Sequence, residues 1–308
     1  MELLKGFNFE PFCGRGTFER EKAFRSLLDM KERTGANFVV FAPNGVQKTA
    51  HSEEIVFDSE HTVSDDELKK MIEYAGSIGL KVGIKPTVNC LDGTWRAFVS
   101  FFPYDVVCEP KWSNWFESYK RFQTHYARLA EEMGCYMFIA GCEMVMTEQR
   151  EEEWRQVIQA IRQEFSGIVT YNTDKYQEDH IKWWDEVDVI ASSGYYPVDD
   201  WENQLDRIEK VAKKFGKDVV FTETGCMSVS GSWNVPNNWE IQGDYNEEQQ
   251  AQWYKAMFEA CSRRSWLRGY ALWDWRVYYD DVEREKRRHK YGVQHKQAEQ
   301  VVSDFFKG

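Results

Sequence analysis

The stretch MFIAGCE, residues 137–143, is a short apolar run that ends in a carboxylate. A second stretch, VVFTET at residues 219–224, has the same form and places Glu223 just beyond an apolar run. A carboxylate at the end of a buried strand has lost much of its hydration, and hydrogen bonds or a function must offset that cost. Two such residues, on strands several strand–helix units apart, predict a pair of carboxylates that face each other across one opening.

Working outward from these two stretches, apolar runs of strand length alternate with helical patterns along the whole chain. The predicted strands are residues 4–9, 37–42, 81–88, 137–140, 168–171, 187–191, 219–221 and 267–273. The predicted helices are residues 18–34, 65–77, 113–133, 151–165, 176–185, 200–215, 247–262 and 297–306. Eight strand–helix units in 308 residues are typical of an α/β fold, the (β/α)8 TIM barrel.

A doubly wound open sheet is the main alternative to the barrel. That fold usually carries a glycine-rich phosphate turn after its first strand, and the match at Gly14–Gly16 is too short to count. No linker or composition shift divides the chain, so we predict one domain over residues 1–308. Three long connections each follow a strand and are expected on the face where barrel active sites lie: residues 43–63, 89–112 and 226–246.

Charge and composition narrow the possible partners. The net charge of −12 argues against nucleic acid and against an anionic membrane surface. Aromatic residues make up 16% of the chain, and flat rings that a core does not need are natural platforms for sugars. The seven cysteines are scattered and form no C-x-x-C, which predicts reduced thiols. With no visible signal peptide or membrane-spanning run, we expect a cytoplasmic protein.

Six short motifs carry a resemblance to a known family. They are GFNFEP (6–11), GIKPTVN (83–89), GCEM (141–144), ASSGYYPV (191–198), FTETG (221–225) and ALWDW (271–275). With them the chain resembles glycoside hydrolase clan A, the retaining (β/α)8 enzymes, over nearly its whole length. Within the clan it is most similar to family 113, whose known activity is β-1,4-mannan hydrolysis. The resemblance implies an oligosaccharide or polysaccharide substrate, no cofactor, Glu143 as general acid/base and Glu223 as nucleophile.

The residues near these motifs supply candidates for substrate binding. Tyr195 or Tyr196 is expected to donate a hydrogen bond to Glu223, and Tyr196 is preferred. Trp273 resembles the tryptophan that floors the sugar subsite beside the cleaved bond, and Trp275 either faces the same cavity or packs beneath it.

Polar and aromatic side chains elsewhere extend the candidate site. Lys85, inside a strand, needs a partner, which is a sugar hydroxyl, one of the carboxylates or an internal ion pair. Side chains near strand ends are weaker sugar-binding candidates: Asn8, Glu10, Asn89 and Asn172. Tryptophans on the long connections either form outer subsites or hold those connections down: Trp95, Trp233 and Trp239.

Two departures from the clan leave the exact sugar open. Cys142 replaces the asparagine that binds the sugar 2-hydroxyl in most of the clan, a change that favours family 113, and Thr87 stands where histidine is expected. A β-xylanase or β-glucosidase is therefore an alternative within the same chemistry. A non-catalytic carbohydrate-binding barrel is a second alternative. Metal catalysis is not predicted, because the six histidines form neither H-x-H nor H-E-x-x-H.

Overall fold

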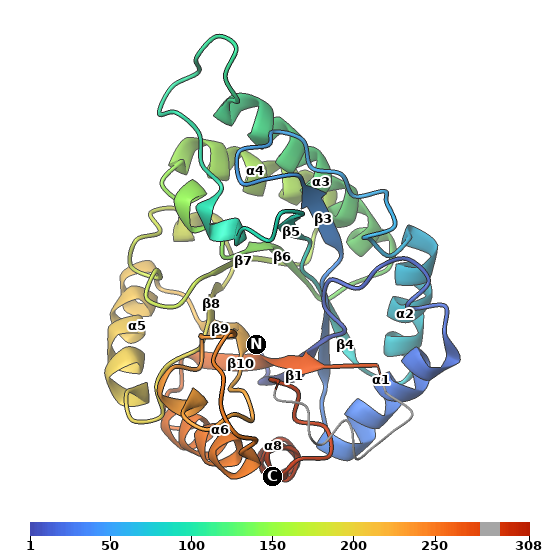
Figure 1. Ribbon diagram of the computed structural model, residues 1–308, viewed down its shortest axis with the longest axis vertical. Helices are drawn as coiled ribbons and strands as arrows, with labels where there is room; N and C mark the ends of the chain where they lie inside the picture. The colour runs from blue at the N-terminus through green and yellow to red at the C-terminus, as the bar shows by residue number, and fades with distance from the viewer. Residues whose placement is uncertain (278–289) are drawn as a thin grey trace.

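Eight parallel strands close into a barrel, as predicted. They are β1 (Leu4–Phe9), β2 (Phe38–Phe41), β4 (Lys81–Ile84), β6 (Met137–Cys142), β7 (Ile168–Thr173), β8 (Ile190–Ser193), β9 (Val219–Thr224) and β10 (Leu267–Trp275). In the computed structural model, which describes residues 1–277 and 290–308, their order is β1-β10-β9-β8-β7-β6-β4-β2 (Figure 1). His289, one of the six histidines, lies outside the described residues.

Helices surround the barrel (Figure 1). They are α1 (Glu21–Thr34), α2 (Asp65–Ser77), α3 (Trp112–Glu132), α4 (Glu151–Glu164), α5 (Trp201–Phe215), α6 (Glu247–Cys261) and α8 (Gln297–Lys307). Each covers the strands with one apolar face, as the three- and four-residue spacing of Leu205, Ile208 and Ala212 on α5 illustrates. Among the described residues, none of these helices is both long enough and apolar enough to cross a bilayer.

The helix predicted at residues 176–185 is wrong. This segment forms turns, followed by the 3-10 helix η3 (Trp184–Glu186). Tyr176 has a left-handed backbone with φ of 64°, which interrupts a right-handed helix at its start. The indole of Trp184 is fully buried and donates to the backbone oxygen of Glu178 at 2.7 Å, so burial of a tryptophan fixes the turns.

One proline divides the strand predicted at residues 81–88, and another separates the strand predicted at residues 37–42 from a further short strand that was not predicted. β4 ends at Ile84, and β5 (Thr87–Cys90) begins only after Pro86, which has no N–H to donate to a neighbouring strand. In the same way β3 (Asn44–Gln47) follows Pro43, and β3 and β5 pair with each other as a separate parallel sheet. Lys85 lies at the break, and its side chain is fully buried.

The barrel interior is filled by apolar side chains from the strands. They form one cluster of buried residues: Leu4, Phe38, Val40, Met137, Ile139, Val189, Val220 and Ala271. A larger apolar layer lies between the strands and the helices and contains most of the buried tryptophans. Because side chains close the interior below, polar groups of the barrel gather at the C-terminal ends of the strands.

Candidate active site

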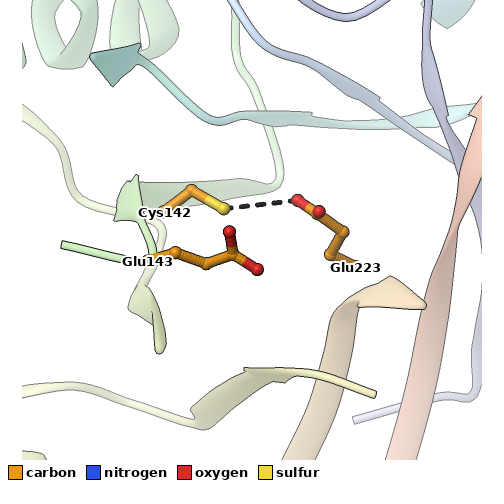
Figure 2. Close-up of side chains that lie close together, drawn as sticks. All are labelled: Cys142, Glu143 and Glu223. Carbon is orange, nitrogen blue, oxygen red and sulfur yellow. Dashed lines mark hydrogen bonds between the residues drawn. The ribbon is translucent and has the colours of Figure 1, made fainter. Parts of the chain in front are cut away.

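The end of β6 has an irregular backbone that brings two consecutive side chains into one place. In a regular strand Cys142 and Glu143 would point to opposite faces. The register of β6 against β7 shifts between Ile139 and Cys142, and Gly141 and Glu143 have left-handed φ values of 88° and 53°. Figure 2 shows both side chains directed toward Glu223 on the opposite strand.

Glycine is required at position 141 for a second reason. A Cβ there would lie 2.0 Å from the hydroxyl oxygen of Tyr119. That hydroxyl donates to the backbone oxygen of Ala140 at 3.1 Å, and so ties α3 to β6 directly beneath the turn. The local sequence therefore fixes the direction in which the Glu143 carboxylate points.

A cavity of about 190 Å³ opens at the C-terminal ends of the strands, and both carboxylates lie on its wall. Aromatic rings form much of the remaining wall, from Phe12, Trp95, Tyr195, Trp239, Trp273 and Tyr291. The polar residues of the wall, besides the two glutamates, are Arg96, Asp174, Lys175 and Asn237. The cavity thus combines ring faces with a few polar groups, which is typical of a small-molecule or sugar site.

Glu143 is held by donors from two separate elements. The hydroxyl of Ser193, at the end of β8, donates to Oε1 at 2.7 Å. The indole N–H of Trp95 and the guanidinium of Arg96 both donate to Oε2, each at 3.3 Å. Arg96 begins the 3-10 helix η1 (Arg96–Phe98) in the connection between β5 and α3.

Glu223 is held by a different set of donors. The ammonium of Lys85 donates to its Oε2 at 2.9 Å, and the thiol of Cys142 donates to the same oxygen at 3.2 Å. The hydroxyl of Tyr195 donates to Oε1 at 2.9 Å. The side chain of Lys85 is fully buried, so this ion pair is largely shielded from solvent.

The two carboxyl groups have opposite tendencies to ionise. Burial, and then the nearby charge of Glu223, raise the pKa of Glu143 to about 8, although Arg96 opposes the rise. Burial also disfavours the charged form of Glu223, but the charge and hydrogen bond of Lys85 outweigh it and hold the pKa of Glu223 below its usual range. Near neutral pH the site therefore holds a protonated acid beside an ionised carboxylate.

The separation between the two carboxylates is short. One carboxylate oxygen of Glu143, one of Glu223 and the sulfur of Cys142 all lie within 4.8 Å of one another. Such a close approach of two oxygens is compatible with direct attack by one carboxylate, for which carboxyl groups about 5–5.5 Å apart are usual.

The same three atoms are a poor fit for a metal ion. The ammonium of Lys85 already lies 2.9 Å from Oε2 of Glu223 and would repel a cation. Burial and the charge of Glu223 raise the pKa of the Cys142 thiol well above its usual value, so the thiolate that a metal requires is disfavoured. We assign no metal to these residues.

The tyrosine prediction is corrected in favour of the neighbouring residue. Tyr195 donates to Glu223, whereas the preferred candidate, Tyr196, is fully buried and donates to Glu178. Both tyrosines follow the last residue of β8, so regular strand alternation no longer decides which one faces the cavity.

The two tryptophans at the end of β10 lie on opposite sides of the barrel wall. Trp273 lines the cavity, as expected, and its ring centroid is 5.5 Å from that of Phe12. Trp275 is fully buried outside the barrel, where its indole donates to Ser26 on α1. The suggestion that Trp275 faces the cavity is therefore wrong, and the ring packs against α1 on the outer side of the barrel wall instead of beneath the cavity.

The asparagine candidates support the site without lining the cavity. Asn8 is fully buried and donates to the backbone oxygens of Thr222 and Ala271. Asn172 is fully buried and donates to Ser193, the partner of Glu143. Asn89 accepts from Arg96 at 2.7 Å.

Other candidates are also placed behind the wall or at its rim. Glu10 accepts from Arg276 and from the backbone of Val277, and Lys85 and Cys142 contact Glu223 from behind. Trp95 and Trp239 line the cavity with ring centroids 5.5 Å apart, whereas Trp233 packs against the core.

Four residues around Glu143 were not singled out from the sequence: three come from connections and one, Ser193, from the end of β8. Arg96 and Ser193 contact Glu143 directly, and Asp174 and Lys175 line the cavity beside it. The signal for Arg96 was its place next to a tryptophan in a long connection on the C-terminal face. Ser193 is a common residue type at the end of an ordinary strand and carried no such signal.

Comparison with known proteins gives consistent matches over the whole chain. The model of Glycoside Hydrolase Family 113 matches residues 7–296. A solved complex of a GH113 β-1,4-mannanase is 49% identical, with a TM-score of 0.98 and 100% of both chains covered. Another GH113 β-1,4-mannanase structure is 50% identical, with the same TM-score and coverage.

A more distant match comes from a named organism. The GH113 β-mannanase AaManA from Alicyclobacillus acidocaldarius, in complex with ManMIm, is 37% identical with a TM-score of 0.95. That match covers 100% of this chain and 98% of the other. A comparison with curated proteins gave no match.

Proposed function

This chain belongs to glycoside hydrolase family 113, and on that premise we propose that it hydrolyses β-1,4-linked mannan or manno-oligosaccharides with retention of configuration. Glu143 is the general acid/base and Glu223 is the nucleophile in this proposal. The observation that carries it is the pair of buried carboxyl groups, within 4.8 Å by their nearest oxygens, with opposite ionisation tendencies. Solved family members of 49–50% identity bear the name β-1,4-mannanase, which supports the choice of sugar.

In the first step the ionised Glu223 attacks the anomeric carbon while Glu143 gives its proton to the departing glycosidic oxygen. The bond from carbon to that oxygen breaks, an ester to Glu223 forms, and the shortened sugar leaves as an alcohol. Lys85 and Tyr195 keep Glu223 ionised before the attack because each donates to one of its oxygens. These two hydrogen bonds also orient the carboxylate of Glu223 toward the cavity.

In the second step a water attacks the anomeric carbon and the now ionised Glu143 takes its proton. The ester bond breaks, Glu223 recovers its charge, and the product keeps the original anomeric configuration. Protonation of Glu143 in the free enzyme and its ionisation in the intermediate follow from the same cause. Once Glu223 is an ester, its negative charge no longer disfavours ionisation of Glu143.

The wall of the cavity suits an uncharged sugar. The negative charge of Glu223 is balanced by the ammonium of Lys85, and Glu143, which lies beside Arg96, is protonated near neutral pH. The ring of Trp273 offers an apolar face next to Glu223, on which the C–H face of a sugar can stack.

A panel of β-1,4-linked manno-, gluco- and xylo-oligosaccharides, with product anomers followed by NMR, tests this proposal. We expect cleavage of the manno series above the others, with the β-anomer formed first. The variants Glu223→Ala and Glu143→Ala should lose turnover, while the exposed Glu132→Gln on α3 serves as the matched control.

Different results would contradict different parts of the proposal. Equal or greater xylo or gluco activity would remove the mannan assignment, and first release of the α-anomer would remove the double displacement. Binding without cleavage by the wild type would favour a carbohydrate-binding barrel. Loss of activity on chelation would favour a metal-dependent hydrolase.

A further inference from the structure

We propose that Arg96, with its neighbour Trp95, is a positioning residue that controls proton transfer by Glu143 in both halves of the reaction, an inference that rests on the proposed function. Both side chains donate to the same carboxylate oxygen, Oε2, each at 3.3 Å. The other oxygen, Oε1, is taken by Ser193. The β5–α3 connection therefore holds one oxygen of the acid/base and β8 holds the other.

The guanidinium of Arg96 is fixed before substrate arrives. Its Nε donates to the backbone oxygen of Val88 at 2.9 Å, and its Nη2 donates to Oδ1 of Asn89 at 2.7 Å. Asn89 in turn donates to Asn44, which ties β5 to β3. With the arginine 8% exposed, its planar fork is held on two sides and its Nη1 points to Glu143.

Arg96 is the cation paired with Glu143. The charged and titratable groups around that carboxyl come from every neighbouring element: Lys85, Arg96, Cys142, Asp174, Lys175, Tyr195, Glu223 and Tyr291. Among them the ammonium of Lys85 is paired with Glu223, and that of Lys175 lies 3.2 Å from Asp174. Only Arg96 forms an ion pair with Glu143 among the described residues.

This pairing favours the ionised form of Glu143 in both steps, with a different consequence in each. In the free enzyme the charge of Glu223 favours protonated Glu143 and Arg96 opposes it, so Arg96 limits how strongly the acid holds its proton. After the ester forms, the charge of Glu223 is gone, the charge of Asp174 still favours the protonated acid, and Arg96 is the paired cation that opposes it. It then favours the ionised Glu143 that accepts a proton from water.

The test compares pH profiles of Arg96→Gln, Arg96→Lys and wild type. The exposed Arg25→Gln on α1 is the matched control. Initial rates with mannopentaose give kcat/KM, whose basic limb reports Glu143 in the free enzyme. A dinitrophenyl β-mannoside, whose leaving group needs no acid, makes the second step limiting, so the acid limb of kcat reports Glu143 in the intermediate.

Removing the charge should move both limbs in the same direction. An opposite charge at this distance shifts a carboxyl by about one pH unit or more, so both limbs of Arg96→Gln should rise by about one unit. Arg96→Lys should shift the two limbs less, because lysine keeps the positive charge but loses the planar guanidinium. The lysine variant also serves as the readout if the glutamine variant does not fold. The control should match wild type.

Unmoved limbs with lower rates in either variant would overturn the inference and leave Arg96 as a support for its connection. The proposed function fails separately, since it requires wild-type cleavage of manno-oligosaccharides, which is measured in the same series. An active wild type with unmoved limbs therefore removes only the role of Arg96.

Discussion

Replacing Lys85 with methionine tests the reason why Glu223 is ionised. The ammonium lies 2.9 Å from Oε2 of Glu223 and is fully buried. At this distance, with an effective dielectric constant of about 20, the attraction is about 6 kcal/mol before desolvation costs. Removing one partner of a buried ion pair typically costs about 3–5 kcal/mol. If most of that cost falls on the ionised nucleophile, kcat/KM drops by about 10²–10³-fold.

The assay is kcat/KM on mannotetraose between acid and neutral pH. Because Lys85 lowers the pKa of Glu223, its removal raises that pKa, and the acid limb of the profile moves to higher pH. Lys81→Met is the matched control, since Lys81 begins β4, the strand that ends just before Lys85, and forms a partly exposed ion pair with Glu2 at the far end of that strand.

Methionine approximates the volume of lysine, so the variant should fold, and thermal unfolding checks this. An acid limb that stays in place, with a loss of activity of less than about threefold, would refute the reasoning. Such a result would mean that Cys142 and Tyr195, the remaining donors to Glu223, suffice to keep it ionised.

Three further predictions follow from the placement of side chains around the cavity. Tyr195→Phe should lower kcat/KM by about 10–100-fold because it removes a hydrogen bond to a charged group, whereas Tyr196→Phe should reduce the free energy of unfolding and leave kinetics near wild type. Trp273→Ala should weaken substrate binding in calorimetry with the stability little changed, while Trp275→Ala should cost about 3–5 kcal/mol in denaturant unfolding. Glu143→Gln should raise Tm near pH 8 and have little effect on Tm near pH 4. The reason is that the pKa of this carboxyl rises from 4.5 to about 8 on folding, so its contribution to stability is lost as the pH increases between these two values.

A specific result would contradict each of these three predictions. Equal kinetic losses for the two tyrosine variants would mean that the hydroxyl partners are misassigned. A Trp275 variant that folds normally but binds poorly would place that ring in the cavity. A destabilised glutamine variant at position 143 near pH 8 would show that burial of the ionised carboxylate carries no cost.

The barrel and its two carboxylates were predictable because both rest on simple periodicities. Apolar runs of strand length alternate with helical patterns, and parallel strands bring their carboxyl ends to one face, so Glu143 and Glu223 had to converge. Thr87, in contrast, was noted at a position where the sugar 2-hydroxyl was expected to be recognised. Its side chain is fully buried and its hydroxyl donates to the backbone oxygen of Lys85, so it does not line the cavity.

The positions of several side chains around the cavity could not be predicted from the sequence, because they depend on irregular backbone and on tertiary contacts. Trp273 and Trp275 are two residues apart, so in a regular strand their side chains would point to the same face. The pairing of β1 with β10 shifts register between Phe7 and Phe9, and the two rings separate. Arg96 meets Glu143 across 47 residues of chain through a connection whose course follows from tertiary contacts.

The sulfur beside the nucleophile has a practical consequence for chemical labelling. Cys142 is fully buried and its thiol pKa is well above the usual value because of burial and then Glu223, so little of the reactive thiolate exists there. Cys108, in contrast, is exposed on the connection that precedes α3. Maleimide dyes and other alkylating tags should therefore react with Cys108 in preference to Cys142, so that a fluorophore can be attached at the periphery while the thiol beside Glu223 stays unmodified.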